Sequence, residues 1–266
     1  MADKLIIART AEEAVRAKNK SNVYMAGGTE VMRLGSAVEA DAFVSVRKVP
    51  YMREIASEDG KVRIGAACTF QELVDNKNVP AYLKEAALFL ASRTRRNMST
   101  IGGNIAVARD DSFLLPTLIA AGAELVLKDV DSEETISAAE YVANADKYKG
   151  KLILSVSVPA KGVNVKSSRS ANTAQSHARL TAALSERDGR YTAVAAVKNS
   201  GIYILGKLSS ALSDSDPNEE EIIEIAKAND NIKLEDDLLY GGADYRRYLI
   251  GITFALMYEE MKGGRS

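Results

Sequence analysis

Two short segments with paired glycines are the best candidates in this chain for binding an anionic ligand. Residues 25–30 read Met-Ala-Gly-Gly-Thr-Glu, and residues 99–105 read Ser-Thr-Ile-Gly-Gly-Asn-Ile. Adjacent glycines lack the side chains that would keep a ligand away from the main chain, and backbone N–H groups at such turns bind phosphates. The hydroxyl and amide side chains beside them can hydrogen-bond oxygen atoms. We predict that two subdomains supply these segments and that together they clamp a phosphate-containing ligand.

Other chemistry is restricted by the supply of reactive side chains. The chain has one cysteine, Cys68, and one histidine, His177. An internal disulfide and a four-cysteine zinc or iron–sulfur site are therefore excluded. A serine–histidine–aspartate triad would have to use His177, and no Gly-x-Ser-x-Gly segment accompanies it. We interpret both residues as structural, predict no catalytic side chain and no metal ligand set, and expect any redox group to be a bound cofactor.

The composition is that of an ordinary globular protein. Of the 266 residues, 46% are hydrophobic and 27% are charged, and the formal net charge is −1. This near-neutral charge gives no reason to expect binding to nucleic acid or to a membrane surface. No stretch approaches the 18 apolar residues of a membrane-spanning helix, and no signal-like segment stands at the N-terminus. We expect a cytoplasmic protein.

Each glycine segment is flanked by elements that would hold it in place. A strand over residues 23–26 leads into the first segment, and a helical turn is expected over residues 30–34 after it. With strands over 4–9 and 42–46 and a helix over 11–18, the first part of the chain reads as a small α/β unit. The run Arg93–Arg96 precedes the second segment. We interpret it as a solvated turn, with counter-charge for an anionic ligand or a docking partner as the alternative.

The remaining elements follow from apolar periodicity and turn residues. Residues 160–175 are polar, and we interpret them as a mobile linker that marks a domain boundary. An antiparallel meander with an Asp188-Gly189 turn is expected after it, and Asp244 is expected to cap a long final helix. Strands are expected over 62–66, 124–128 and 151–158, and then over 178–184, 191–197 and 201–208. Helices are expected from 69, where Thr69 and Glu72 form a capping box, and over 80–90, 113–121, 137–143, 217–228 and 245–261.

The ordered set of motifs resembles the FAD-binding (medium) subunit of the molybdenum hydroxylase family, which includes xanthine dehydrogenase-like and carbon monoxide dehydrogenase-like flavoprotein subunits. The resemblance covers the whole chain, and its most specific block lies around the second glycine segment. Residues that carry it are Met25–Glu30, Phe43–Val46, Val49–Met52, Val62–Ala66, Arg96–Asn97, Thr100–Ala106, Leu114–Pro116, Leu152–Pro159 and Asp244–Leu249.

This resemblance implies an α+β fold. A two-subdomain FAD-binding domain of the vanillyl-alcohol-oxidase/PCMH type would span residues 1–160, with subdomains of about 1–55 and 56–160. A smaller C-terminal α+β domain with an antiparallel sheet would span 161–266. The implied FAD contacts are Tyr24, Met25, Ala26, Gly27, Gly28, Thr29, Glu30, Val31, Leu90, Thr100, Ile101, Gly102, Gly103, Asn104, Asp110, Leu154 and Lys166. For Leu90 and Leu154, ordinary core packing is the alternative, and His177 has a place near the flavin edge as its alternative.

The resemblance also implies partners: a small subunit with iron–sulfur clusters and a large subunit with the molybdenum cofactor. Electrons would pass from the clusters through FAD to NAD or another acceptor. Two departures from the family pattern leave details open. Phe113 stands where relatives commonly have Asp, so Asp110 or Asp111 would have to take the place of that aspartate. The acidic residue that family members have shortly after the positions of Lys166 and Arg169 is missing here, which leaves open whether NAD is the electron acceptor. A stand-alone FAD-dependent oxidoreductase and a non-catalytic nucleotide-binding protein are the alternative functions.

Overall fold

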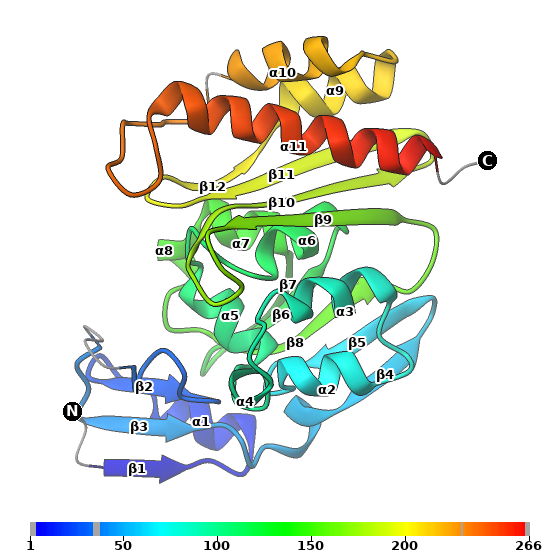
Figure 1. Cartoon of the computed structure of the whole chain (residues 1–266). Coiled ribbons are helices and arrows are strands. Elements are labelled where there is room, and N and C mark those ends of the chain that lie inside the picture. The colour runs from blue at the N-terminus through cyan, green and yellow to red at the C-terminus, as the bar shows by residue number, and fades with distance from the viewer. Residues whose placement is uncertain (1–3, 34–37, 230, 264–266) are drawn as a thin grey trace. The chain divides into compact units, whose positions relative to one another are not determined.

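The computed structural model describes residues 4–33, 38–229 and 231–263. These residues form two compact units (Figure 1). The first unit comprises the chain up to Pro80 together with Leu90–Ala108 and Gly122–Ala160, and the second comprises Ala81–Phe89, Arg109–Ala121 and the chain from Lys161 onward. The division into folding domains at residue 160 stays a prediction. Among the described residues, no helix is long and apolar enough to cross a membrane.

The first unit begins with a small parallel sheet. Strands β1 (Lys4–Ile7), β3 (Ala42–Ser45) and β2 (Asn22–Met25) lie in that order, all parallel. Helix α1 (Ala11–Ala17) connects β1 to β2, and the Thr10 hydroxyl caps it by accepting a hydrogen bond from the Glu13 N–H at 3.1 Å. Since parallel strands end at the same edge, the segment that follows β2 leaves the sheet beside the end of β3.

The second sheet of the first unit has five antiparallel strands in the order β4-β5-β8-β6-β7. Alternating side chains bury one face of β5 and β6, so that Val62, Ile64, Leu125 and Leu127 are fully buried. The strands are β4 (Ile55–Glu58), β5 (Lys61–Gly65), β6 (Glu124–Lys128), β7 (Glu133–Ser137) and β8 (Leu152–Pro159).

Short helices surround these sheets within the first unit. Helix α2 (Phe70–Asp75) begins at the predicted capping box, because the Thr69 hydroxyl and the Glu72 carboxylate each accept from the other residue's backbone N–H. The others are η1 (Pro50–Arg53), α4 (Arg93–Arg96), α5 (Ile101–Val107), α7 (Ala138–Ala143) and α8 (Ala145–Tyr148).

The second unit is built on one antiparallel sheet in the order β12-β11-β10-β9. The predicted turn at Asp188-Gly189 is confirmed: both residues have positive φ, 52° and 78°, which matches the twist of a two-residue hairpin. Leu180, Leu184 and Phe254 belong to the core that helices form on one face of this sheet. The strands are β9 (Asn164–Ala171), β10 (Ala178–Arg187), β11 (Arg190–Val197) and β12 (Gly201–Ile204); the helices are α3 (Ala81–Leu88), α6 (Leu115–Ala120), α9 (Gly206–Asp214), α10 (Glu219–Lys227) and α11 (Ala243–Gly263).

The α+β class with antiparallel sheets is confirmed, but one segment is different from the prediction. The expected mobile linker over residues 160–175 contains β9, which pairs with β10 along its length. A strand at the edge of a sheet has a single neighbour, so it tolerates the serines and charged residues that made this stretch read as a linker. The meander's last strand ends at Ile204 and α9 follows, and α11 begins at Ala243, so Asp244 lies inside the helix rather than before it.

Candidate functional site

The first glycine segment lies in the first unit, directly after the carboxyl end of β2. The Met25 carbonyl accepts from the Val46 N–H at 3.1 Å, which completes the pairing with β3. Gly28 then turns the chain with φ +74°, a conformation that glycine adopts without strain. The Met32 N–H donates to the Gly28 carbonyl at 2.9 Å. The expected helical turn over 30–34 is therefore a single closed turn in its described part, and Leu34 lies outside the described residues.

A row of backbone donors is left open in this segment. Within the described parts of the chain, the N–H groups of residues 26–29 donate to no protein acceptor. The segment is half-buried, so these donors are only partly available to water. Consecutive N–H groups beside a glycine in the left-handed conformation form an anion-binding concavity. This row fits the pyrophosphate of a dinucleotide.

The second glycine segment is the start of a helix and not the turn that was expected there. Thr100 is the N-cap of α5, and its hydroxyl accepts from the Gly103 N–H at 3.1 Å. The N–H groups of Ile101 and Gly102 donate to the carbonyls of Cys68 and Ala66 at 3.0 and 2.9 Å. The donors predicted to face a phosphate are thus already paired, because α5 packs its first turn onto the segment that follows β5.

The two glycine segments nevertheless touch each other within the first unit. A Cβ atom on Gly27 would lie 1.6 Å from the Met98 carbonyl oxygen, so the two backbones are in direct contact at this point. The Ser99 hydroxyl donates to the Thr29 hydroxyl at 3.2 Å. A Cβ on Gly102 would likewise lie 2.7 Å from the Ala66 carbonyl oxygen. Gly27 and Gly102 therefore serve close packing of the chain, while the open donors belong to the first segment.

Four other predicted contacts also lie in the first unit. Ile101 is fully buried, and Leu90 and Leu154 are 3% and 6% exposed. The Leu154 carbonyl accepts from the Ala66 N–H at 2.9 Å, on the same short stretch that receives Gly102. Tyr24 is half-buried on β2, and burial raises the pKa of its hydroxyl, which stays protonated. The contact of each with a ligand stays a prediction.

The predicted residues Asp110 and Lys166 belong to the second unit. Asp110 accepts from the Lys198 ammonium and from the Asn199 N–H, both at 2.8 Å. Lys166 is partly exposed and lies 3.9 Å from the Glu260 carboxylate. Both residues are thus engaged within their own unit, and their role toward a ligand of the first unit stays a prediction.

The neighbouring Asp111 is a buried carboxylate. The sequence left open whether Asp110 or Asp111 takes the place of the aspartate that relatives have at the position of Phe113. Arg109 donates to it at 2.7 Å, Lys198 lies 3.8 Å away, and His177 also hydrogen-bonds it. Burial alone would raise the pKa of Asp111, but the hydrogen bond and charge of Arg109, the charge of Lys198 and the His177 contact lower that pKa to about 2. The structural interpretation of His177 agrees with this pairing, which the sequence could not indicate because the two residues lie on different segments.

The predicted solvated turn at Arg93–Arg96 is also wrong. These residues form α4, with Arg93 and Arg95 exposed and Arg96 buried. The sequence does not distinguish Arg96 from Arg93 and Arg95, because only the packing of α4 buries the first and exposes the other two.

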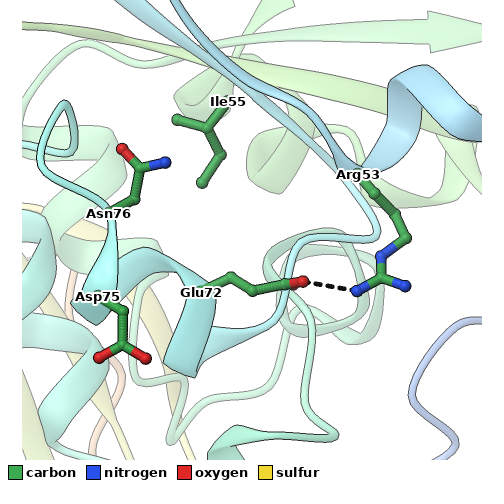
Figure 2. Close-up of a pocket in the computed structure, with 5 residues that line it drawn as sticks. All are labelled: Arg53, Ile55, Glu72, Asp75 and Asn76. Atoms are coloured by element: carbon green, nitrogen blue, oxygen red, sulfur yellow. Dashed lines mark hydrogen bonds and ion pairs between the residues drawn. The ribbon is translucent and has the colours of Figure 1, made fainter.

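A surface pocket also lies in the first unit, and none of the residues predicted to bind a ligand lines it. Its volume is about 330 Å³, and it is lined by Arg53, Ile55, Glu72, Asp75 and Asn76. In Figure 2 the Arg53 guanidinium and the Glu72 carboxylate point toward each other, at 2.5 Å. Across the described residues, no group of three or more histidine, cysteine or acidic side chains could hold a metal ion.

Comparison with known sequences identifies an FAD-binding family. Residues 2–161 match the family described as the FAD binding domain in molybdopterin dehydrogenase. The protein YgfM of Escherichia coli (strain K12) is 29% identical over 253 residues, which are 94% of this chain and 92% of YgfM. The xanthine dehydrogenase FAD-binding subunit of Escherichia coli O157:H7 is 35% identical over 114 residues, 39% of this chain and 38% of that protein.

Solved structures share the fold over nearly the whole chain. Quinoline 2-oxidoreductase from Pseudomonas putida 86 contains a chain with a TM-score of 0.85 and 18% identity, and the match covers 98% of both chains. A chain of carbon monoxide dehydrogenase from Hydrogenophaga pseudoflava has a TM-score of 0.83 and 20% identity, with 97% of both chains covered. At these identities the likeness is one of fold.

Proposed function

Because this chain belongs to the family of FAD binding domains in molybdopterin dehydrogenase, and FAD is therefore its cofactor, we propose that it is the FAD-carrying electron-transfer subunit of a molybdenum hydroxylase. The observation that carries the proposal is the contact between the two glycine segments beside an open row of backbone donors. A protein of this kind binds and orients the flavin, and the flavin supplies the redox chemistry by accepting and releasing electrons.

The residues of the first unit have separate roles in this proposal. The N–H groups of residues 26–29 would bind the pyrophosphate, since they are donors without a protein acceptor in the described chain. Thr29 and Ser99 would present hydroxyls beside it, and Asn104 an amide. Leu90 and Leu154 would offer apolar contact from the core side of the same unit. No side chain has to act as an acid or a base.

The partners and the acceptor are also part of the proposal. We expect a small iron–sulfur subunit as the electron donor and a large molybdenum-cofactor subunit as the place of substrate hydroxylation. What supports a multi-subunit molybdenum enzyme is that one relative is named a xanthine dehydrogenase FAD-binding subunit and that one protein of the same fold is a carbon monoxide dehydrogenase with a molybdenum cofactor. The acceptor would be NAD or another oxidant. A xanthine-type substrate and a cytoplasmic location stay predictions.

Flavin uptake tests the first part of the proposal. The purified chain, stripped of cofactor, is titrated with FAD while flavin fluorescence and visible absorbance are followed. Saturable binding of one FAD per chain is the expected result. A folded chain that takes up no FAD would refute the proposed function.

Co-expression with the genes that neighbour its own then tests the subunit assignment. Recovery of a complex that contains an iron–sulfur protein, in which substrate reduces the FAD of this chain, is expected. Substrate-dependent turnover by the chain alone would favour the stand-alone oxidoreductase instead.

A further inference from the structure

Arg96 is a buried cation of the first unit that the proposed function does not use. It is 9% exposed and lies at the last position of α4. Its side chain donates to three neutral acceptors: Nε to the Gln71 side-chain oxygen at 2.9 Å, and Nη1 to the carbonyls of Leu90 and Ala91 at 2.8 Å each. A guanidinium directs several donors in a fixed plane, so it can hold several chain segments in one geometry.

The three acceptors lie on two different parts of the unit. Leu90 and Ala91 precede α4, while Gln71 is on α2 and donates in turn to Asp75 at 2.8 Å. Arg96 therefore joins the connection before α4 to the side of α2. Because α4 is a single turn of four residues, its own helical hydrogen bonds contribute little stability, and contacts such as this fork help to fix its orientation.

The chain that leaves α4 is the support of the first glycine segment. The Ser99 N–H donates to the Arg95 carbonyl at 2.8 Å, and the Ser99 carbonyl accepts from the Phe70 N–H at 2.9 Å. Gly27 packs against the Met98 carbonyl, and Thr29 accepts from the Ser99 hydroxyl. A shift of α4 would thus move Met98 and Ser99, and with them the surface on which the open donors rest.

We propose that Arg96 is the positioning residue of the FAD site, which holds Leu90–Ala91, α2 and α4 in the one arrangement that sets the first glycine segment. This inference rests on the proposed function, because it concerns the same site. Arg96 acts through the backbone of Met98 and Ser99.

The test compares the wild-type chain with Arg96→Ala, Arg96→Lys and Arg95→Ala. Arg95 is the matched control, since it is an exposed arginine on the same helix and contributes only backbone bonds. We expect Arg96→Ala to raise the Kd for FAD by about 10- to 150-fold, the range that corresponds to one charge-assisted hydrogen bond. Arg96→Lys should also weaken FAD binding, because an ammonium keeps the charge but cannot reproduce the planar set of donors of the guanidinium. Arg95→Ala should bind as the wild type does.

Chemical rescue distinguishes positioning from general damage. Guanidinium ion, added at millimolar concentration to the Arg96→Ala chain, should restore FAD affinity and the visible circular-dichroism band of the bound flavin. The same addition should leave a Gly27→Ala chain weak, since its defect is steric.

Three outcomes decide the proposal. A folded Arg96→Ala chain with the FAD affinity of Arg95→Ala would overturn it, and so would a weakened, folded Arg96→Ala chain that guanidinium does not restore. If Arg96→Ala does not fold, Arg96→Lys decides: weakened binding by a folded Lys variant supports the proposal, and wild-type affinity overturns it. Failure of the wild-type chain itself to bind FAD would instead refute the proposed function.

Discussion

Substitution of Gly27 by alanine is the most direct test of the contact between the two glycine segments. The new Cβ would lie 1.6 Å from the Met98 carbonyl oxygen and 2.6 Å from the Met98 carbonyl carbon. Both neighbours are backbone atoms, so no side-chain rotation can relieve the overlap. The two segments would have to separate by about 1.8 Å before an ordinary van der Waals contact is reached.

The expected magnitudes follow from this displacement. Overpacking of this kind typically costs about 1–3 kcal/mol of stability, and the hydrogen bond from Ser99 to Thr29 would be broken. If the open donors of residues 26–29 lose one charge-assisted bond to the pyrophosphate, FAD affinity falls by about 1.5–3 kcal/mol. That loss is roughly 10- to 150-fold in Kd.

Two measurements check this prediction: the Kd for FAD by titration of the cofactor-free chain, and the free energy of unfolding by urea. Gly206→Ala is the control, because a Cβ at Gly206 meets nothing within 4 Å and the residue has no positive φ. The control should retain wild-type FAD affinity and should be as stable as the wild type or slightly more stable. Wild-type FAD affinity in Gly27→Ala, with stability equal to that of Gly206→Ala, would refute the packing argument.

Three further predictions concern single residues. Gly28→Val should abolish FAD retention, because a β-branched residue resists the φ of +74°. The control Gly60→Val, at φ +77° with nothing within 4 Å, should lose comparable stability and keep its FAD affinity. Equal loss of FAD in both variants would contradict this prediction. Asp111 has a folded-state pKa of about 2, below its ordinary 3.8, so its stabilisation is present above about pH 4 and is lost as the pH falls toward 2. Asp111→Asn should remove about 2 kcal/mol of pH-dependent stability in urea unfolding across that window, and an unchanged pH profile would count against the buried ion pairs. Cys68 is fully buried, and burial raises its thiol pKa to about 12. A thiol reagent should therefore label Cys68 only after unfolding. Rapid labelling of the native chain would contradict this and would show that the connection between β5 and α2 opens.

Several features could be predicted from the sequence because their geometry depends only on neighbouring residues. A capping box such as Thr69 with Glu72 satisfies its donors within four residues, so its geometry does not depend on the rest of the fold. The turn at Asp188-Gly189 is equally local, since it needs only two residues that tolerate positive φ. The pairing of the two glycine segments as one feature was also predicted, and both lie in the first unit.

The sequence did not predict which distant segments pair as strands. The polar stretch that contains β9 forms a strand because β10 supplies its hydrogen bonds, and no local pattern records that partner. The short strands β4 and β7 were missed for the same reason. Asp111 owes its low pKa to Arg109, two residues earlier, together with Lys198 and His177, which come from distant segments that only folding brings close to it.

By itself, therefore, the sequence determined where the chain can turn tightly and which paired glycines stand beside hydroxyl and amide groups, because these are properties of single residues and their neighbours. The tertiary structure decided what each glycine does. Gly27 and Gly102 are small because another backbone lies against them, and Gly28 is a glycine because of its φ. It also decided that Arg96, one of three arginines in a single helical turn, faces inward, since burial depends on what packs against a helix and not on the residue type.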